Sequence, residues 1–191
     1  ELLVSSVDDS QVIRFSAAVT RTPSKAEKFC ASRNISLSSD LYDVLNDDSI
    51  DAVVIATPHS QHFGQIMLSA VAGKHIYCEK PWTLDVGEAR ISLHALADAG
   101  LKVGVGHNRR FAPNTLAMKK ILEGGELGTP IHMDGHFHAN LAPAVGAWRD
   151  SRIESPAGGM TSMGIHAVDM FINLFGRISD VQVQSKRVAS P

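Results

Sequence analysis

The first two thirds of the chain alternate short apolar stretches with stretches of helical spacing, and this alternation constrains the fold most. Strands are predicted at 12–19, 50–56, 75–78 and 101–106, where β-branched and apolar residues run together. Helices are predicted at 1–4, 23–33, 40–45, 62–72 and 85–100. Strands that alternate with helices indicate an α/β fold with a mainly parallel sheet.

Helix-boundary residues support these assignments. Pro23 stands in the first turn of one predicted helix, where its missing N–H costs nothing. Asp85 precedes another helix and is followed three residues later by Glu88, which is the pattern of a capping box. Gly73 and Gly100 follow the last helical residues, as glycine does at helix ends.

Composition limits the classes of function. The chain has 191 residues, 44% of them hydrophobic, and a formal net charge of -2, which predicts a soluble globular protein of one or two domains. This charge gives no reason to expect a nucleic-acid or membrane partner. Two cysteines, Cys30 and Cys78, lie in apolar patterns and indicate reduced, buried thiols in a cytoplasmic protein.

The composition shifts near residue 125, where a second domain is predicted to begin. The first domain would span 1–125 and the second 126–191. After a helix at 113–124, the second domain would hold a strand at 131–138 and a loop at 141–160. A helix at 165–174 and a last strand at 180–188 would follow.

Polar groups follow three successive predicted strands. Glu79-Lys80-Pro81 comes after the strand at 75–78, and a threonine, a proline and two histidines occupy 57–62 after the strand before it. His107-Asn108-Arg109-Arg110-Phe111 comes after the next strand. The carboxyl ends of parallel strands share one edge, so these segments predict a common ligand site. Taken alone, Glu79-Lys80 would be interpreted as a surface ion pair.

A fourth polar segment opens the helix at 165–174. Gly158 and Gly159 precede it, and glycines permit close backbone approach. His166 and Asp169 lie three residues apart on one helix face, so Asp169 could orient the imidazole of His166. The competing interpretation is that His166 is a packing residue at a helix start.

In this order and spacing, these segments resemble the Gfo/Idh/MocA family, which includes glucose-fructose oxidoreductase and inositol dehydrogenase. The resemblance covers nearly the whole chain. The residues that carry it are Thr57, Pro58, His62, Glu79, Lys80, Pro81, Asn108, Arg109, Arg110, Phe111, Trp148, Arg149, Gly164, Ile165, His166 and Asp169.

The resemblance implies a Rossmann-like domain followed by an α/β domain with an open, mainly antiparallel sheet. It also implies an NAD(P)-dependent oxidoreductase that transfers hydride between nicotinamide and a sugar, polyol or related compound. Such an enzyme would form homo-oligomers through the sheet of its second domain. No metal is expected.

The resemblance also assigns residue roles. Lys80 would stabilise charge on the reacting oxygen and His166 would transfer the proton, so both are candidate catalytic residues. Lys80, Ser162 and His166 would bind the substrate. The candidate cofactor-binding residues are Thr20, Arg21, Thr57, Pro58, His59, His62, Glu79, Lys80, Pro81, Asn108, Trp148 and Arg149.

The choice between NAD and NADP can be addressed at Thr20-Arg21-Thr22, which follows the strand at 12–19. NAD-preferring relatives usually place a carboxylate at this point to bind the ribose hydroxyls. Here Arg21 is available to a 2′-phosphate, so NADP is favoured over NAD. Alternatively, Arg21 stacks on the adenine and leaves the preference open.

Two departures from the family pattern are visible. Ser162 stands where many members carry a second catalytic aspartate, and a hydroxyl holds no charge at neutral pH. No first strand and no glycine-rich turn precede Val12, so the Rossmann-like domain is expected to be incomplete, as is the second domain at its far end.

Two further interpretations stay open. The chain could be a non-catalytic sugar- or nucleotide-binding relative, which Ser162 would fit. A metal site built from His132, His136, His138 and His166 is less favoured, because a polar strand face explains these side chains.

Overall fold

The computed structural model describes residues 2–137, 148 and 151–184. It separates into two compact units, Glu1–Val105 and Gly106–Pro191, and each is described by itself. The sequence-based boundary, at 125/126, lies further along the chain.

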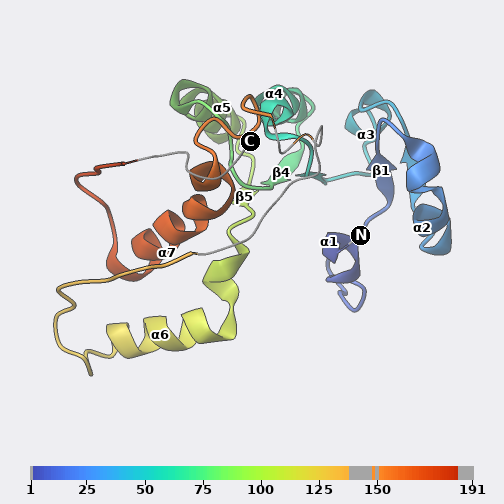
Figure 1. The fold of residues 1–191 in the computed structure, drawn as a ribbon. Helices are drawn as coiled ribbons and strands as arrows, with labels where there is room; N and C mark the ends of the chain where they lie inside the picture. Colours follow the sequence, from blue (N-terminus) through green and yellow to red (C-terminus); the bar gives the residue numbers. More distant parts are fainter. Residues whose placement is uncertain (1, 138–147, 149–150, 185–191) are drawn as a thin grey trace. The chain divides into compact units, whose positions relative to one another are not determined.

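The first unit alternates strands and helices as expected (Figure 1). Its strands are β1 (Ala17–Val19), β2 (Ser36–Ser38), β3 (Ala52–Ile55), β4 (His75–Cys78) and β5 (Val103–Val105). Its helices are α1 (Leu2–Ser5), η1 (Pro23–Lys25), α2 (Glu27–Ser32), α3 (Tyr42–Leu45), η2 (His59–Gln61), α4 (His62–Val71) and α5 (Val86–Asp98).

All the strand pairs described are parallel. β1 pairs with β2, and β4 lies between β3 and β5 in a separate three-stranded sheet. Within each sheet, this order is the one found in doubly wound nucleotide-binding folds. The predicted α/β fold with a Rossmann-like arrangement is therefore confirmed.

The core of the first unit lies where α4 and α5 cover the three-stranded sheet (Figure 1). Ile66 of α4, Leu96 of α5 and Cys78 of β4 are almost completely removed from solvent. Trp82 packs against this cluster and donates its indole N–H to Ser92 Oγ at 2.9 Å. This hydrogen bond satisfies the polar atom of an otherwise apolar side chain.

Local signals placed α4 and α5 correctly. The carboxylate of Asp85 accepts hydrogen bonds from the backbone N–H groups of Gly87 (2.7 Å) and Glu88 (3.0 Å), as an N-cap should. Gly73 and Gly100 follow α4 and α5 with φ of 72° and 67°, a conformation that glycine adopts without strain.

The first strand is shorter than the sequence suggested. Only Ala17–Val19 pairs with a neighbour, and Val12 is 92% exposed. The hydroxyl of Ser10 accepts hydrogen bonds from the N–H groups of Val12 and Ile13, which gives this backbone a local alternative to a sheet ladder. The sequence also missed β2, whose residues Ser36–Ser38 are mostly polar.

The second unit is mainly helical over its described residues. It contains η3 (Asn108–Phe111), α6 (Pro113–Glu123), the π-helical turn η5 (Met160–Gly164) and α7 (Ile165–Phe175). η3 contacts both α6 and α7.

The strands predicted at 131–138 and 180–188 were wrong over the residues that the structure describes, 131–137 and 180–184. A strand needs a partner for its ladder bonds, and these stretches pair with no other described segment. Phe137 instead lies under the guanidinium of Arg109, 5.0 Å from the ring centroid.

In the described part of the chain, no helix is long and apolar enough to cross a bilayer.

Candidate active site

Two polar loops lie next to each other at the carboxyl ends of β3 and β4. Ile55 of β3 and Cys78 of β4 are partners in the parallel register, so Thr57 and Glu79 leave the sheet at the same edge. The N–H of Glu79 donates to the carbonyl of Ile55 at 2.8 Å and extends the pairing by one step. The prediction that these two loops share one edge is confirmed.

The Thr57 loop is held by the helix that follows it. Thr57 Oγ1 donates to Gln65 Oε1 at 2.7 Å, and the Gln65 amide nitrogen donates to Gln61 Oε1 at 3.3 Å. Both glutamines point back to the strand end from η2 and α4. Sequence reasoning missed Gln65, although its position four residues after Gln61 on one helix face was a usable signal.

His62 joins the two loops from below the surface. Its Nδ1 lies 2.8 Å from the carbonyl oxygen of Pro81, and its Nε2 lies 3.0 Å from that of Thr57. The ring is 0% exposed, so it contacts protein atoms on all sides. The side chain therefore has no exposed surface, and its predicted contact with the cofactor stays a prediction.

Cys78 lies beside this histidine. Its Sγ is 3.4 Å from His62 Nδ1 and 3.3 Å from the carbonyl oxygen of Glu79. Burial, followed by the nearby charge of Glu79, raises the pKa of the Cys78 thiol to about 12. The thiol is thus protonated at neutral pH and acts as a packing group.

Lys80 and its neighbours form the outer part of the edge. Lys80 and Glu79 are partly exposed, whereas Pro81 is buried, and the Lys80–Pro81 peptide bond is cis. His59 is nearly buried, with its ring edge-on to that of His62 at 5.7 Å between centroids. The structure therefore gathers six of the predicted residues here, which are Thr57, Pro58, His59, Glu79, Lys80 and Pro81.

Thr20 and Arg21 follow β1 in the other sheet. The N–H of Thr20 donates to the carbonyl of Ser38 at 3.0 Å, and Thr20 Oγ1 accepts from the N–H of Thr22 at 3.4 Å. The Arg21 side chain is exposed. A turn stiffened in this way presents a cation at the carboxyl end of a parallel strand.

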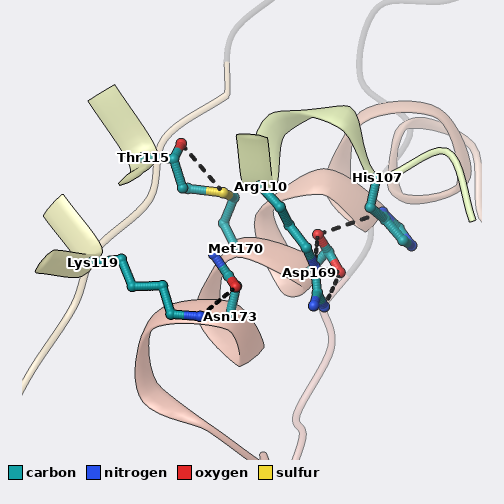
Figure 2. A network of polar contacts seen from close by, with 7 residues as sticks. All are labelled: His107, Arg110, Thr115, Lys119, Asp169, Met170 and Asn173. Atoms are coloured by element: carbon teal, nitrogen blue, oxygen red, sulfur yellow. Dashed lines mark hydrogen bonds and ion pairs between the residues drawn. The ribbon is translucent and has the colours of Figure 1, made fainter. Parts of the chain in front are cut away.

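In the second unit, Asp169 of α7 is the centre of a polar network (Figure 2). Arg110 Nε donates to both carboxylate oxygens at 3.0 and 2.9 Å, and Arg110 Nη2 donates to Oδ1 at 2.5 Å. His107 Nδ1 lies 3.6 Å from Oδ2. The hydrogen bond to Asp169 raises the pKa of Arg110.

His166 stands in the first turn of α7, near this network. Its ring is edge-on to that of His107, with 6.3 Å between centroids. Ser162 lies in the π-helical turn before α7, and its hydroxyl donates to the carbonyl of Gly159 at 3.5 Å. The sequence suggested that the Asp169 carboxylate orients the His166 imidazole. It gave no sign that Arg110 binds this carboxylate.

The other predicted site residues of the second unit are Asn108 and Trp148-Arg149. Asn108 begins η3. Trp148 is partly buried, and its carbonyl accepts from the N–H of Ser151 at 3.2 Å. Arg149 lies outside the described residues. Lys80 belongs to the first unit and His166 to the second, so each is placed within its own unit.

The histidines considered as a metal site lie only partly within the described residues. His132 Nε2 lies 3.1 Å from Asp134 Oδ2, and both side chains are exposed. His138 lies outside the described residues. Within the part of the chain that is described, no three His, Cys, Asp or Glu side chains are grouped as metal ligands.

Parallel strands covered by helices, with polar loops at their carboxyl ends, define the class of Rossmann-type nucleotide-binding proteins. Residues 3–107 match the family described as "Oxidoreductase family, NAD-binding Rossmann fold", and residues 115–191 match "GFO/IDH/MocA C-terminal domain". The chain belongs to the Gfo/Idh/MocA family of oxidoreductases.

Named relatives include two inositol dehydrogenases. The inositol 2-dehydrogenase of Mycolicibacterium gilvum (strain PYR-GCK) is 36% identical over 162 residues, which are 83% of this chain and 44% of the relative. The scyllo-inositol 2-dehydrogenase (NAD(+)) of Bacillus subtilis (strain 168) is 35% identical over 139 residues, which are 73% of this chain and 39% of the relative. The chain thus spans less than half the length of these relatives.

Solved structures agree with the fold. The crystal structure of an NAD-binding protein from Listeria innocua superposes with a TM-score of 0.81 at 26% identity. The match covers 91% of this chain and 50% of that one.

Proposed function

We propose that this chain is the nicotinamide- and substrate-binding part of an NAD(P)-dependent oxidoreductase that acts on a sugar or polyol. The observation that carries this proposal is the shared edge of β3 and β4, where Thr57-Pro58 and Glu79-Lys80-Pro81 leave the sheet together. Doubly wound folds bind dinucleotides at this edge. The two inositol dehydrogenases among the relatives support a polyol as the substrate class.

The residues present at the edge suit a nicotinamide cofactor and a hydroxylated substrate. Thr57 and Lys80 are both partly exposed at this edge, and the Thr57 hydroxyl oxygen can accept a further hydrogen bond. The cofactor, when bound, accepts or supplies the hydride. The Lys80 ammonium would hydrogen-bond the substrate oxygen and stabilise the negative charge that develops there.

The second unit would supply the proton-transfer group. We assign this role to the imidazole of His166, which takes the hydroxyl proton in oxidation and returns it in reduction. Ser162, one turn earlier, would hydrogen-bond a substrate hydroxyl. Asn108 and Trp148-Arg149 would contact the cofactor. These assignments rest on the family pattern and on the position of each residue in its unit.

NADP is the cofactor that the exposed residues favour. Arg21 is exposed at the end of β1, where a guanidinium can pair with a 2′-phosphate through two parallel hydrogen bonds. A site that prefers NAD usually has a carboxylate at this position, which binds the two ribose hydroxyls.

The setting of the enzyme is part of the same proposal. Cys30 and Cys78 are free and buried, as expected of a cytoplasmic protein.

Self-association is also proposed. Three apolar residues of the second unit are largely exposed, and self-association would cover them: Ile131, Val181 and Val183. Light scattering of the full-length protein would give the oligomeric state.

The test is turnover by the full-length protein with a panel of polyols and both nicotinamide cofactors. Lys80→Met should lower kcat/KM by about 100-fold or more, because it removes the cation at the reacting oxygen. Lys102→Met changes an exposed lysine that precedes β5 and should leave kcat/KM unchanged. No turnover with any polyol and either cofactor, together with ligand binding that Lys80→Met weakens, would favour the non-catalytic alternative.

A further inference from the structure

His62 is placed where one side chain can fix the positions of two loops at once. Its ring lies between the carbonyl oxygen of Thr57, just after β3, and that of Pro81, just after Lys80. Thr57 and Pro81 come from different βα connections, and these contacts link them directly. The ring is completely buried, so solvent does not compete for either nitrogen.

The chemistry of the two contacts makes histidine difficult to replace. Both atoms that face the ring are carbonyl oxygens, which only accept hydrogen bonds. A neutral imidazole has one N–H and donates to one carbonyl at a time, with the other ring nitrogen beside the second carbonyl. An apolar side chain of similar size would offer a donor to neither carbonyl.

The linked backbone is the backbone that carries Lys80. Pro81 O belongs to the residue directly after Lys80, and Cys78, two residues before Lys80, contacts the same ring at 3.4 Å. The chain is therefore fixed against His62 on both sides of Lys80. On the β3 side, the carbonyl that faces His62 Nε2 belongs to Thr57, whose hydroxyl donates to Gln65 Oε1.

We propose that His62 is a positioning residue, which sets the place of the Lys80 ammonium relative to the Thr57 loop without touching substrate or cofactor. This inference rests on the proposed function for the catalytic role of Lys80. His62 would act through its contacts with the backbone on both sides of Lys80. Displacing a catalytic group by about 1 Å can lower the rate by about 100-fold.

The kinetic test uses the full-length enzyme with His62→Ala, His62→Asn and His62→Gln. His62→Ala should lower kcat at saturating substrate and cofactor by about tenfold or more, assayed well below its thermal midpoint. His62→Asn or His62→Gln should recover part of this loss, because an amide nitrogen can donate to one of the two carbonyls. His94→Asn changes an exposed histidine of α5 and is the matched control.

A second measurement reports on Lys80 without any turnover. Lysines dimethylated with ¹³C each give an NMR signal, and Lys80→Arg assigns the signal of Lys80. His62→Ala should shift or broaden the Lys80 signal and leave that of Lys102 in place. A polyol screen without turnover, combined with a shifted Lys80 signal, would contradict the proposed function and support the positioning role.

Two results would overturn the positioning role. One is a His62→Ala enzyme that is less stable but keeps the wild-type kcat per folded molecule. The other is a Lys80 signal that is unchanged in folded His62→Ala protein.

Discussion

Asp169 binds Arg110 through both carboxylate oxygens, and this contact joins η3 to α7 in the second unit (Figure 2). The Asp169 side chain is only 8% exposed, and burying a carboxylate is costly unless a cation pairs with it. The fork of the guanidinium matches the carboxylate in two parallel hydrogen bonds. His107, the residue before η3, and His166, in the first turn of α7, are thereby held in edge-on contact.

The first prediction concerns this ion pair. Asp169→Asn should lower the free energy of unfolding by about 1–3 kcal/mol, because it leaves the Arg110 cation unpaired beside a buried amide. The guanidinium is partly exposed, which keeps the cost below that of a fully buried pair. Urea unfolding of the full-length protein measures it.

The matched control is Glu123→Gln, which removes an exposed partner of Lys119 in α6. That pair should contribute about 0.5 kcal/mol or less. Equal losses for Asp169→Asn and Glu123→Gln would show that the Asp169 pair is an ordinary surface pair.

The second prediction concerns stability at alkaline pH. The pKa of Cys78 is raised from 9.0 to about 12 in the folded protein, so the folded state holds this proton more tightly than the unfolded state. The stabilisation is fully present below pH 9 and is lost as the pH rises from 9 to about 12. Cys78→Ala should therefore flatten the fall in stability over this range.

Urea midpoints at several alkaline pH values, for wild type and Cys78→Ala, measure this slope. Cys30→Ala removes another buried thiol and controls for lost packing. In the folded wild type, Cys78 should also resist alkylation by iodoacetamide at pH 8, because the thiolate is the reactive form. Rapid alkylation of Cys78 in folded protein would contradict the raised pKa.

The third prediction concerns the N-cap of α5. Asp85→Ala should cost about 1 kcal/mol, because the N–H groups of Gly87 and Glu88 lose their acceptor. Asp85→Asn keeps a side-chain oxygen and should cost only a few tenths of that amount. Thermal unfolding of the three proteins gives the comparison, and an alanine variant as stable as the asparagine variant would be inconsistent with capping.

Signals that act over a few residues could be read from the sequence. Asp85, Gly73 and Gly100 fix helix ends by contacts within one turn, and the structure confirms all three. The shared edge of Thr57 and Glu79 could also be predicted, because parallel strands impose it.

Contacts between distant residues could not be read in this way. Nothing local in the sequence of α7 says that Asp169 binds Arg110, which lies 59 residues earlier. The motif spacing identified His62 but not its burial, because burial depends on how α4 packs under two loops. The alternation at 131–137 suggested a strand, yet a strand also needs a partner, and none of the described segments pairs with it.

The fourth prediction concerns cofactor choice in the full-length enzyme. Arg21→Glu should lower kcat/KM for NADP by about tenfold or more and leave or improve that for NAD, because a carboxylate repels a 2′-phosphate and binds ribose hydroxyls. Arg14→Glu makes the same charge change at an exposed residue before β1 and should change the two cofactors equally. If Arg21→Glu lowers kcat/KM for both cofactors to the same extent, Arg21 stacks on the adenine and does not select the phosphate.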